Sequence, residues 1–423
     1  MKKRVLILML LMGSLYPGFT KAQEDTTVEK GAFICILGKD HKGNDEIIGL
    51  FKETQLPHFQ DPRAPRFLLI DQKRKVALGI GGYVKMTVSS DFKGISDDLD
   101  FIPYDISVPN NHRDNGQYQM DVFTSRLFLK LVGNNHALGK YTAYLETDFR
   151  GPHHTLRLRQ AYVSMKGFLL GMSWSTFSDL AALPPTIDFN GPNGNTDLRN
   201  VQLRYEFSMG KHWKAAVAAE APDVTGTFSD ETSQIHQRMP DIPMWIQFNW
   251  GKNSHIRASG LLRGLSYRND LLEKNKMKMG WGVQLSGLAG LGPLTFFYQG
   301  TYGKGIAQYI SDVSGNNLDL VPNTERPGQL QPMPVLGVVG GLQWTISPKF
   351  FVSANYSLAH AYYEKGFTVP DGYRQGQYIC TNAFMNLTKE CMLGVEYLHG
   401  IREDLNKEKG HANRIQAMIQ YNF

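Results

Sequence analysis

The sequence predicts an all-β fold, a transmembrane antiparallel β-barrel of about sixteen strands with short periplasmic turns and long outer loops. Three observations predict this fold. From residue 76 onward, apolar and polar residues alternate in segments of roughly ten to fifteen residues, which is typical of half-apolar strands. The connectors between these segments are alternately short and long, as in outer-membrane barrels. The N-terminus carries an export signal.

The first 22 residues are predicted to be a cleaved signal peptide. Residues 2–4 (Lys-Lys-Arg) form a positively charged start, and residues 5–15 form an apolar stretch. Thr20 and Ala22 are small residues at the two positions that define a cleavage site. A short apolar stretch followed by such a site is typical of secretion and not of a transmembrane helix.

Composition excludes several other classes of protein. The chain has 45 basic and 39 acidic residues, and loss of the four basic residues of the signal peptide leaves 41 against 39. A nearly neutral mature chain gives no charge argument for nucleic-acid binding. After residue 22 there is no run of 18 or more apolar residues, and the mean hydropathy is −0.31, which excludes a helical membrane protein.

Three cysteines are too few for a disulfide framework. Cys380 and Cys391 are expected to lie nearly opposite each other on a hairpin, and a single disulfide between them is compatible with the periplasm. The alternative is that both are small apolar side chains that face lipid.

Residues 23–75 do not share the strand pattern, and we expect a periplasmic N-terminal extension there, ordered in part at residues 67–70. Three prolines interrupt this region. It is too short for the plug domain of an energised transporter. The β-barrel is expected over residues 76–423, and an even number of strands leaves both termini on the periplasmic side.

The last expected strand illustrates the alternation. Between residues 413 and 423 the odd positions are mostly apolar or aromatic, and the even positions are mostly polar. The sheet must close, because an open edge in hydrocarbon leaves backbone groups without partners. Sixteen strands enclose a lumen that side chains do not fill. Strands are expected near 76–90, 118–132, 139–150, 154–166, 167–175, 199–208, 212–222, 243–251, 254–264, 277–290, 292–303, 334–346, 349–363, 373–386, 388–400 and 411–423.

The connectors separate into two kinds. The short ones are turn sequences such as Lys166-Gly167, Gly210-Lys211 and Ser347-Pro348-Lys349. Short periplasmic turns that alternate with long outer loops are the layout of an outer-membrane barrel. The connectors expected to be long are 91–117, 176–198, 223–242, 265–276, 304–333 and 401–410.

No catalytic motif is present, so we expect no enzyme and no cofactor. The sequence has no Gly-x-Ser-x-Gly elbow, no His-Glu-x-x-His and no phosphate loop. The acidic group Asp97, Asp98 and Asp100 has oxygen ligands suited to Ca²⁺, but a solvated charge cluster is the preferred interpretation, and no metal site is predicted.

The inward-facing positions are expected to be basic. The polar face of the strands carries twelve bases and six acids, and the candidate pore-lining bases are Arg126, Arg150, Arg157, Arg159 and Arg204. An excess of positive charge in a lumen attracts anions. The alternative is that Arg–Glu pairs only brace the wall. The remaining bases are Lys85, Lys130, Lys214, Arg257, Arg263, Lys278 and Arg414, and the acids are Glu146, Asp148, Glu206, Glu220, Glu390 and Glu396.

The connector 176–198 is predicted to be a constriction loop that folds into the barrel. It contains Asp179, Asp188 and Asp197 together with a Pro-Pro pair and a Gly-Pro-Asn-Gly sequence. This composition suits a compact acidic loop opposite an arginine-rich wall. A surface loop is the alternative.

Aromatic residues near strand ends have two expected roles. Those on apolar faces, including Trp174 and Tyr421, are expected to form girdles at the membrane interfaces. Tyr421 and Phe423 end the last strand and are predicted to be an assembly signal for the barrel-assembly machinery.

Three stretches resemble the DcaP-like outer-membrane porins: Ala77-Leu-Gly-Ile-Gly-Gly-Tyr-Val-Lys-Met, Arg157-Leu-Arg-Gln-Ala-Tyr-Val-Ser and Leu170-Gly-Met-Ser-Trp-Ser-Thr-Phe-Ser-Asp. The resemblance implies a sixteen-stranded trimeric porin for small, preferentially anionic solutes such as dicarboxylates. It also assigns Arg157, Arg159 and Trp174 to the pore. Family members often begin with a coiled coil, whereas residues 23–75 show no heptads.

The predicted function is therefore passive diffusion of small hydrophilic, preferentially anionic solutes through an outer-membrane porin. The expected partners are outer-membrane lipid, these solutes, the assembly machinery and two further copies of the chain; nucleic acid is not among them. The alternative is a barrel-anchored structural or interaction protein whose outer loops, 304–333 above all, bind a partner.

Overall fold

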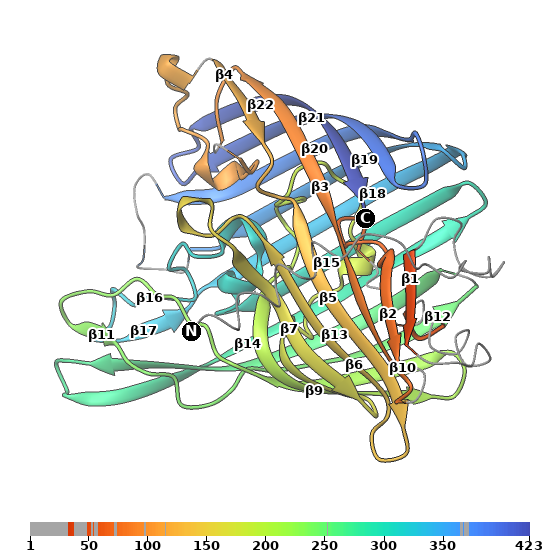
Figure 1. The fold of residues 1–423 in the computed structure, drawn as a ribbon. Coiled ribbons are helices and arrows are strands. Elements are labelled where there is room, and N and C mark those ends of the chain that lie inside the picture. The colour runs from red at the N-terminus through yellow and green to blue at the C-terminus, as the bar shows by residue number, and fades with distance from the viewer. Residues whose placement is uncertain are drawn as a thin grey trace, which may run out of the picture.

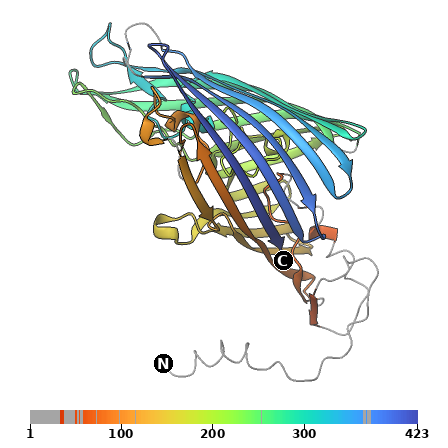
Figure 2. The same cartoon turned by 90° about the horizontal axis from the view of Figure 1, so that it is seen from above.

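The main sheet of the computed structural model closes on itself into a barrel (Figures 1 and 2). The last strand, β22, pairs antiparallel with β3 near the start of the chain, with Tyr421 opposite Val84. The predicted fold is thus confirmed: a closed barrel of sixteen antiparallel strands. The structure describes residues 33–37 (backbone only), 49–51, 54, 58–71, 74–96, 99–114, 116–251, 253–363, 367 and 372–423. The predicted signal peptide and the Asp97-Asp98 pair lie outside these residues.

Two short strands share one position in the barrel wall. β4 pairs with the second half of β3, and β5 pairs with its first half. They form one broken strand over the range where the sequence predicts a continuous one. In the first half of the barrel the strands are β3 (Val76–Phe92), β4 (Gly116–Asp121), β5 (Arg126–Asn135), β6 (Gly139–Asp148), β7 (Arg157–Met165), β8 (Phe168–Trp174), β9 (Arg199–Met209), β10 (Trp213–Glu220) and β12 (Ile242–Trp250).

The remaining strands follow the same up-and-down order. Two outer connections that were expected to be long, 265–276 and 401–410, are instead mostly strand, because the backbone pairing continues, for example from Asn269 to Lys274. The second half of the barrel consists of β13 (Ser254–Asn269), β14 (Lys274–Leu291), β15 (Leu294–Lys304), β18 (Pro334–Ser347), β19 (Phe350–Ala361), β20 (Tyr373–Asn386), β21 (Cys391–Asp404) and β22 (Lys409–Asn422).

The alternation of side chains along the strands separates the two faces of the wall. On β22, Ile415 and Tyr421 are about half exposed on the outside, at 55% and 51%, whereas Arg414 and Gln416 are buried inside. Charges on the outer face would cost roughly 2–4 kcal/mol each at mid-membrane, which explains why they point inward. Among the described residues no helix is both long and apolar enough to cross a membrane.

Several outer connections fold into the lumen and fill much of it. Loop 305–333 contributes Ile306, Tyr309 and Ile310 to a buried apolar cluster that also contains Phe177 of loop 176–198. The two loops hydrogen-bond to each other, with the Ser311 amide 3.0 Å from the Asn195 carbonyl oxygen. Minor elements in the connections are β11 (Thr232–Gln234), β16 (Leu320–Pro322), β17 (Leu330–Pro332) and the 3-10 helices η1 (Pro103–Asp105), η2 (His112–Asp114), η3 (Pro152–His154), η4 (Leu180–Ala182), η5 (Ala307–Tyr309) and η6 (Ser311–Val313).

The N-terminal region adds two strands to the edge of the sheet. β2 (Phe67–Asp71) pairs antiparallel with the first residues of β3, and β1 (Phe33–Leu37) pairs parallel with β2. β22 pairs with β3 only from Tyr83 onward, so β2 occupies the edge that β22 leaves open. This is the predicted periplasmic end, where the C-terminus also lies (Figure 2).

The expectation that Cys380 and Cys391 lie nearly opposite each other is wrong. Cys380 and Cys391 are both free thiols. Their strands are adjacent, but Cys380 lies opposite Leu398 and Cys391 opposite Tyr421, because the turn between β20 and β21 falls close to Cys391. Cys380 does not face lipid either: it is fully buried in a cluster with Phe101 and Tyr378.

Candidate pore constriction

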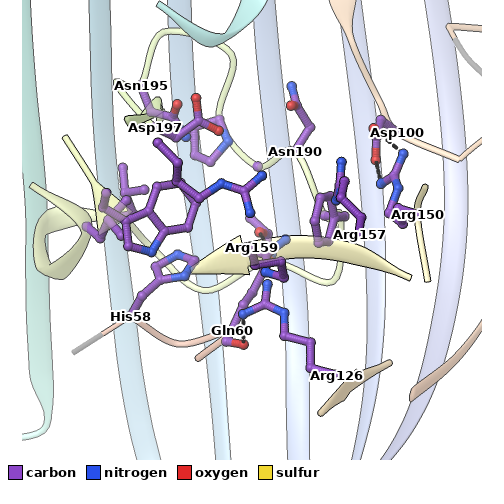
Figure 3. Close-up of a pocket in the computed structure, with 18 residues that line it drawn as sticks. His58, Gln60, Asp100, Arg126, Arg150, Arg157, Arg159, Asn190, Asn195 and Asp197 are labelled. Atoms are coloured by element: carbon purple, nitrogen blue, oxygen red, sulfur yellow. Dashed lines mark hydrogen bonds and ion pairs between the residues drawn. The ribbon is translucent and has the colours of Figure 1, made fainter. Parts of the chain in front are cut away.

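Five arginines surround one cavity in the lumen, and we call them the arginine cluster (Figure 3). Neighbouring parts of the wall contribute them: β5, the connection after β6, β7 and the start of β9. The cavity has a volume of about 190 Å³. Residues of loop 176–198 and of the segment before β2 line its other sides. The members of the cluster are Arg126, Arg150, Arg157, Arg159 and Arg199.

Two carboxylates on β6 hold the buried members of the cluster. Arg159 donates to Glu146 at 2.7 Å and to Asp148 at 2.9 Å, and Arg157 donates to Asp148 at 2.6 Å. Arg126 lies 3.5 Å from Glu146. Both carboxylates are fully buried, so each needs at least one of these arginines as a partner, and each has two.

The other two members differ in their partners. Arg150 makes a bidentate pair with Asp100 of the first outer loop, at 2.5 and 2.7 Å. Arg199 makes no ion pair with any of the described residues, and one of its Nη atoms is buried without a hydrogen-bond partner. The cluster therefore combines four paired guanidinium groups with one that is free of a carboxylate partner.

Aromatic rings position the guanidinium groups. The ring of Phe189, from loop 176–198, lies 4.5 Å from the Arg150 guanidinium and 5.1 Å from that of Arg159. The ring of Trp174 lies between Arg159 and Arg199, at 5.8 and 5.0 Å. Each such cation–π contact contributes about 0.5–2 kcal/mol.

Sequence reasoning missed Phe189 and Arg199, and it gave Trp174 two roles: strand alternation placed it in an interface girdle, whereas the family resemblance assigned it to the pore. On β9 the exposed residues are odd-numbered, so alternation assigns Arg199 to lipid. Its position at the first residue of the strand, where the loop enters, lets the side chain turn inward. Trp174 occupies the equivalent end of β8 and lines the cavity instead of joining an interface girdle. One feature of the sequence could have indicated Phe189: it is an aromatic residue next to Asp188, in a loop expected to face arginines.

Arg204 does not belong to the cluster. It lies on β9 between Leu169 of β8 and Ala218 of β10, and it is half-buried. It does not line the cavity.

Loop 176–198 crosses the lumen and is fixed near its start and near its middle. Near its start, the Asp179 carboxylate accepts hydrogen bonds from Ser286 at 2.6 Å and His255 at 2.9 Å. Near its middle, the Asp188 amide donates to Glu396 on the far wall at 2.9 Å, and the Asp188 carboxylate accepts from Tyr378 at 3.1 Å. Asp179 and Asp188 thus anchor the loop to the barrel wall.

Asp197 is the acid of the loop that lines the cavity. It lies beside Asn195, on the other side of the cavity from Arg150 (Figure 3). Burial raises the pKa of Asp197 to about 6, although the Arg199 charge acts in the opposite direction.

The basic excess counted along the strands is offset by acids that lie outside the expected strands. Arg414 pairs with Asp91 at 2.6 Å. Arg263 pairs with Asp241 at 2.9 Å and with Asp319 at 3.0 Å. Strand alternation does not detect carboxylates that loops bring into the lumen. In the part of the chain that is described, no three His, Cys, Asp or Glu side chains group as metal ligands do.

A closed sixteen-stranded barrel with an inward loop and a cavity of arginines defines an outer-membrane porin. Solved structures agree. The outer membrane channel DcaP of Acinetobacter baumannii matches with a TM-score of 0.72 at 21% identity, over 84% of this chain and 99% of that one. OmpT of Vibrio cholerae matches at 0.53 and 10% identity, over 82% and 98%. An anion-selective porin from Comamonas acidovorans matches at 0.52 and 13% identity, over 82% and 100%.

The chain belongs to the DcaP outer membrane protein family, whose model matches residues 49–294. The resemblance drawn from the sequence is thereby confirmed, and with it the assignment to the outer-membrane porins. No curated protein matches the sequence.

Proposed function

We propose that the protein is a passive channel through which small hydrophilic solutes, preferentially anions such as dicarboxylates, cross the outer membrane. The observation that carries the proposal is the arginine cluster around one cavity of the lumen. Fixed charges of one sign in a narrow aqueous passage concentrate counter-ions, and the low-dielectric wall focuses their field. The channel needs no catalytic step and no cofactor.

The formal charges of the side chains around the cavity nearly balance. The cavity is basic because the positive groups are more accessible to a solute than the negative ones. The carboxylates of Glu146 and Asp148 are fully buried behind the arginines, whereas a third of the Arg157 side chain is exposed. Arg199 adds a guanidinium group that has no carboxylate partner in the part of the chain that the structure describes. A solute in the cavity therefore meets more positive than negative surface, and a molecule with two carboxylates can engage two guanidinium groups.

Ion selectivity tests this proposal. We expect the wild-type channel to prefer Cl⁻ over K⁺ in a KCl gradient, and Arg157→Gln with Arg199→Gln to shift the reversal potential toward zero. Asp148 keeps Arg159 as its partner in this variant, so the wall stays neutralised. The preference should fade between 0.1 M and 1 M salt, since the Debye length falls from about 10 Å to about 3 Å.

The matched control is Arg204→Gln, which removes a lumen arginine that does not line the cavity. We expect this variant to keep the wild-type reversal potential. A cation-selective wild type, or equal shifts in both variants, would contradict the assignment of selectivity to the arginine cluster.

We further propose that the protein functions as a homotrimer in the outer membrane. A trimer form of OmpT of Vibrio cholerae is among the similar structures. The outer wall over β5–β8 carries an apolar hollow lined by Leu129, Ala143, Val163 and Leu170, which suits packing against another barrel. Light scattering of the detergent-solubilised protein should give three times the mass of the mature chain, and a monomer would argue against this assembly.

A further inference from the structure

Residues 58–66, which precede β2, cross the inside of the barrel, and we call them the crossing segment. Phe59 packs against Phe351 and Phe384 of β19 and β20, with ring centroids 5.9 and 4.8 Å apart. Farther along, Arg66 pairs with Glu390 at 2.7 Å. These contacts lie on β19 and β20 and in the turn after β20, far around the wall from the arginine cluster.

At its start, the crossing segment touches the arginine cluster. The Gln60 carbonyl oxygen accepts hydrogen bonds from Arg126 at 2.9 Å and from the Tyr83 hydroxyl at 3.3 Å. The Asp61 carboxylate is buried and lies 3.7 Å from the Arg126 guanidinium group. It accepts a hydrogen bond from the His58 backbone amide at 3.0 Å. The segment therefore connects the basic wall to the opposite wall.

The same segment also meets the constriction loop. The Gln60 side-chain amide donates to the Asp188 carbonyl oxygen at 2.7 Å and to the Thr186 hydroxyl at 3.3 Å. His58 and Gln60 both line the arginine cavity, beside Arg126 (Figure 3). Loop 176–198 enters from the outer side, so the cavity is bounded by two chain segments that enter from opposite ends of the barrel.

We propose that residues 58–61 are the periplasmic half of the constriction and help to determine the size and charge of the solutes that pass. The inference rests on the proposed porin function. His58 and Gln60 limit the space below the arginine cluster, and Asp61 offsets the charge of Arg126. Strand patterns do not reveal this role, because the segment lies outside every strand of the barrel.

Conductance measures the space that the side chains occupy. We expect His58→Ala with Gln60→Ala to raise the single-channel conductance, because both side chains line the cavity and the main-chain contact of Gln60 with Arg126 remains. The control is Gln343→Ala, a glutamine of β18 that bonds to Thr345 and does not line the cavity. It should keep the wild-type conductance.

Thiol labelling gives a second readout that does not depend on widening the pore. In a chain whose native cysteines are replaced by Ala, His58→Cys should react with a negatively charged methanethiosulfonate reagent, and the current should fall. Leu138→Cys, in an exposed turn between β5 and β6, should react without a change of current.

The outcomes separate the two proposals. Unchanged conductance of the alanine variant, together with a His58→Cys variant that is unreactive or electrically silent, would overturn the role of the crossing segment, even if Arg157→Gln with Arg199→Gln still shifts selectivity. A wild-type protein that does not conduct would instead overturn the porin function. A rise in conductance, together with a current block on labelling of the His58→Cys variant, would support both.

Discussion

At the scale of single residues, burial and pairing decide what each lumen arginine does. Arg126, Arg159, Arg263 and Arg414 are all almost fully buried and paired with carboxylates. A charge without water must have a partner, so these four residues hold the wall and the loops together. Arg157 keeps contact with the cavity, and Arg199 has no carboxylate partner among the described residues, so we propose that these two residues act on solutes.

Loss of a buried pair should be costly. Arg263 holds Asp241 and Asp319, both fully buried, and thereby fixes loop 305–333 to β13. We expect Arg263→Met to lower the free energy of unfolding by about 3–5 kcal/mol, because two buried carboxylates lose their partner. Arg268→Met, which removes a partly exposed pair with Asp270, should cost at most about 1 kcal/mol. Unfolding in detergent compares the two, and equal losses would contradict this account.

Two carboxyl groups beside the arginine cluster should make selectivity depend on pH. Burial raises the pKa of Asp61 to about 7, against the opposing charge of Arg126, and Glu146 raises it further. The pKa of Asp197 is about 6 for the same main reason, with Arg199 opposing and Asp100 adding to the shift. Both acids become neutral as pH falls from about 8 to about 5, so positive charge is left unbalanced and anion preference should rise.

Reversal potentials at pH 8 and pH 5 measure this effect. Asp61→Asn with Asp197→Asn should show the high anion preference at both values, since the amides do not titrate. His58 should not contribute, because burial and the charges of Arg126 and Arg159 lower its pKa to about 3. A variant with the same pH dependence as the wild type would show that other groups titrate.

At the scale of elements, closure of the barrel and occupation of the lumen depend on a few segments. The backbone of Phe423 extends the β22–β3 pairing by two hydrogen bonds with Gly82, at 3.0 and 3.1 Å. Loop 305–333, part of the 304–333 connection to which the alternative function assigns partner binding, is mostly buried, and its exposed residues are 315, 317 and 324–327. Its contacts are with the barrel, with loop 176–198, with the connection between β10 and β12, and with the first outer loop.

Deletion of Phe423 should impair assembly. The deletion removes both hydrogen bonds between Phe423 and Gly82. It also removes one of the two rings of the predicted assembly signal, the other being that of Tyr421 on the lipid face. We expect less heat-modifiable, membrane-integrated protein on gels. Phe423→Tyr keeps the backbone and the ring and should assemble normally. Full assembly of the deletion would show that the last residue is dispensable.

Shortening the constriction loop should widen the passage. Replacing residues 184–193 by a short Gly-Ser linker removes Phe189 and the loop contact with Gln60, and single-channel conductance should rise. The control is removal of the exposed tip 324–327 of loop 305–333, which should leave conductance unchanged. If the first deletion has no effect, the bore is set by other segments.

At the scale of the whole molecule, the sequence predicts the wall well because the wall obeys local rules. A strand in lipid must alternate, its ends need turn residues, and the closed sheet follows from backbone hydrogen bonding in hydrocarbon. Most observed strands begin and end within a few residues of the expected ranges. The largest differences are the break between β4 and β5 and the longer hairpins β13–β14 and β21–β22, where pairing beyond the membrane overrides the local pattern.

The lumen obeys no local rule, and only the tertiary structure determines it. By itself, the sequence determined the barrel and the inward positions of Arg126, Arg157 and Arg159. It also predicts an export signal. Contacts between distant segments decided that Phe189 and Trp174 pack on these arginines, that Arg199 turns inward, and that Gln60 meets Asp188. The physical reason is that alternation fixes which face a strand residue occupies, whereas a loop is placed by the partners it finds across the barrel.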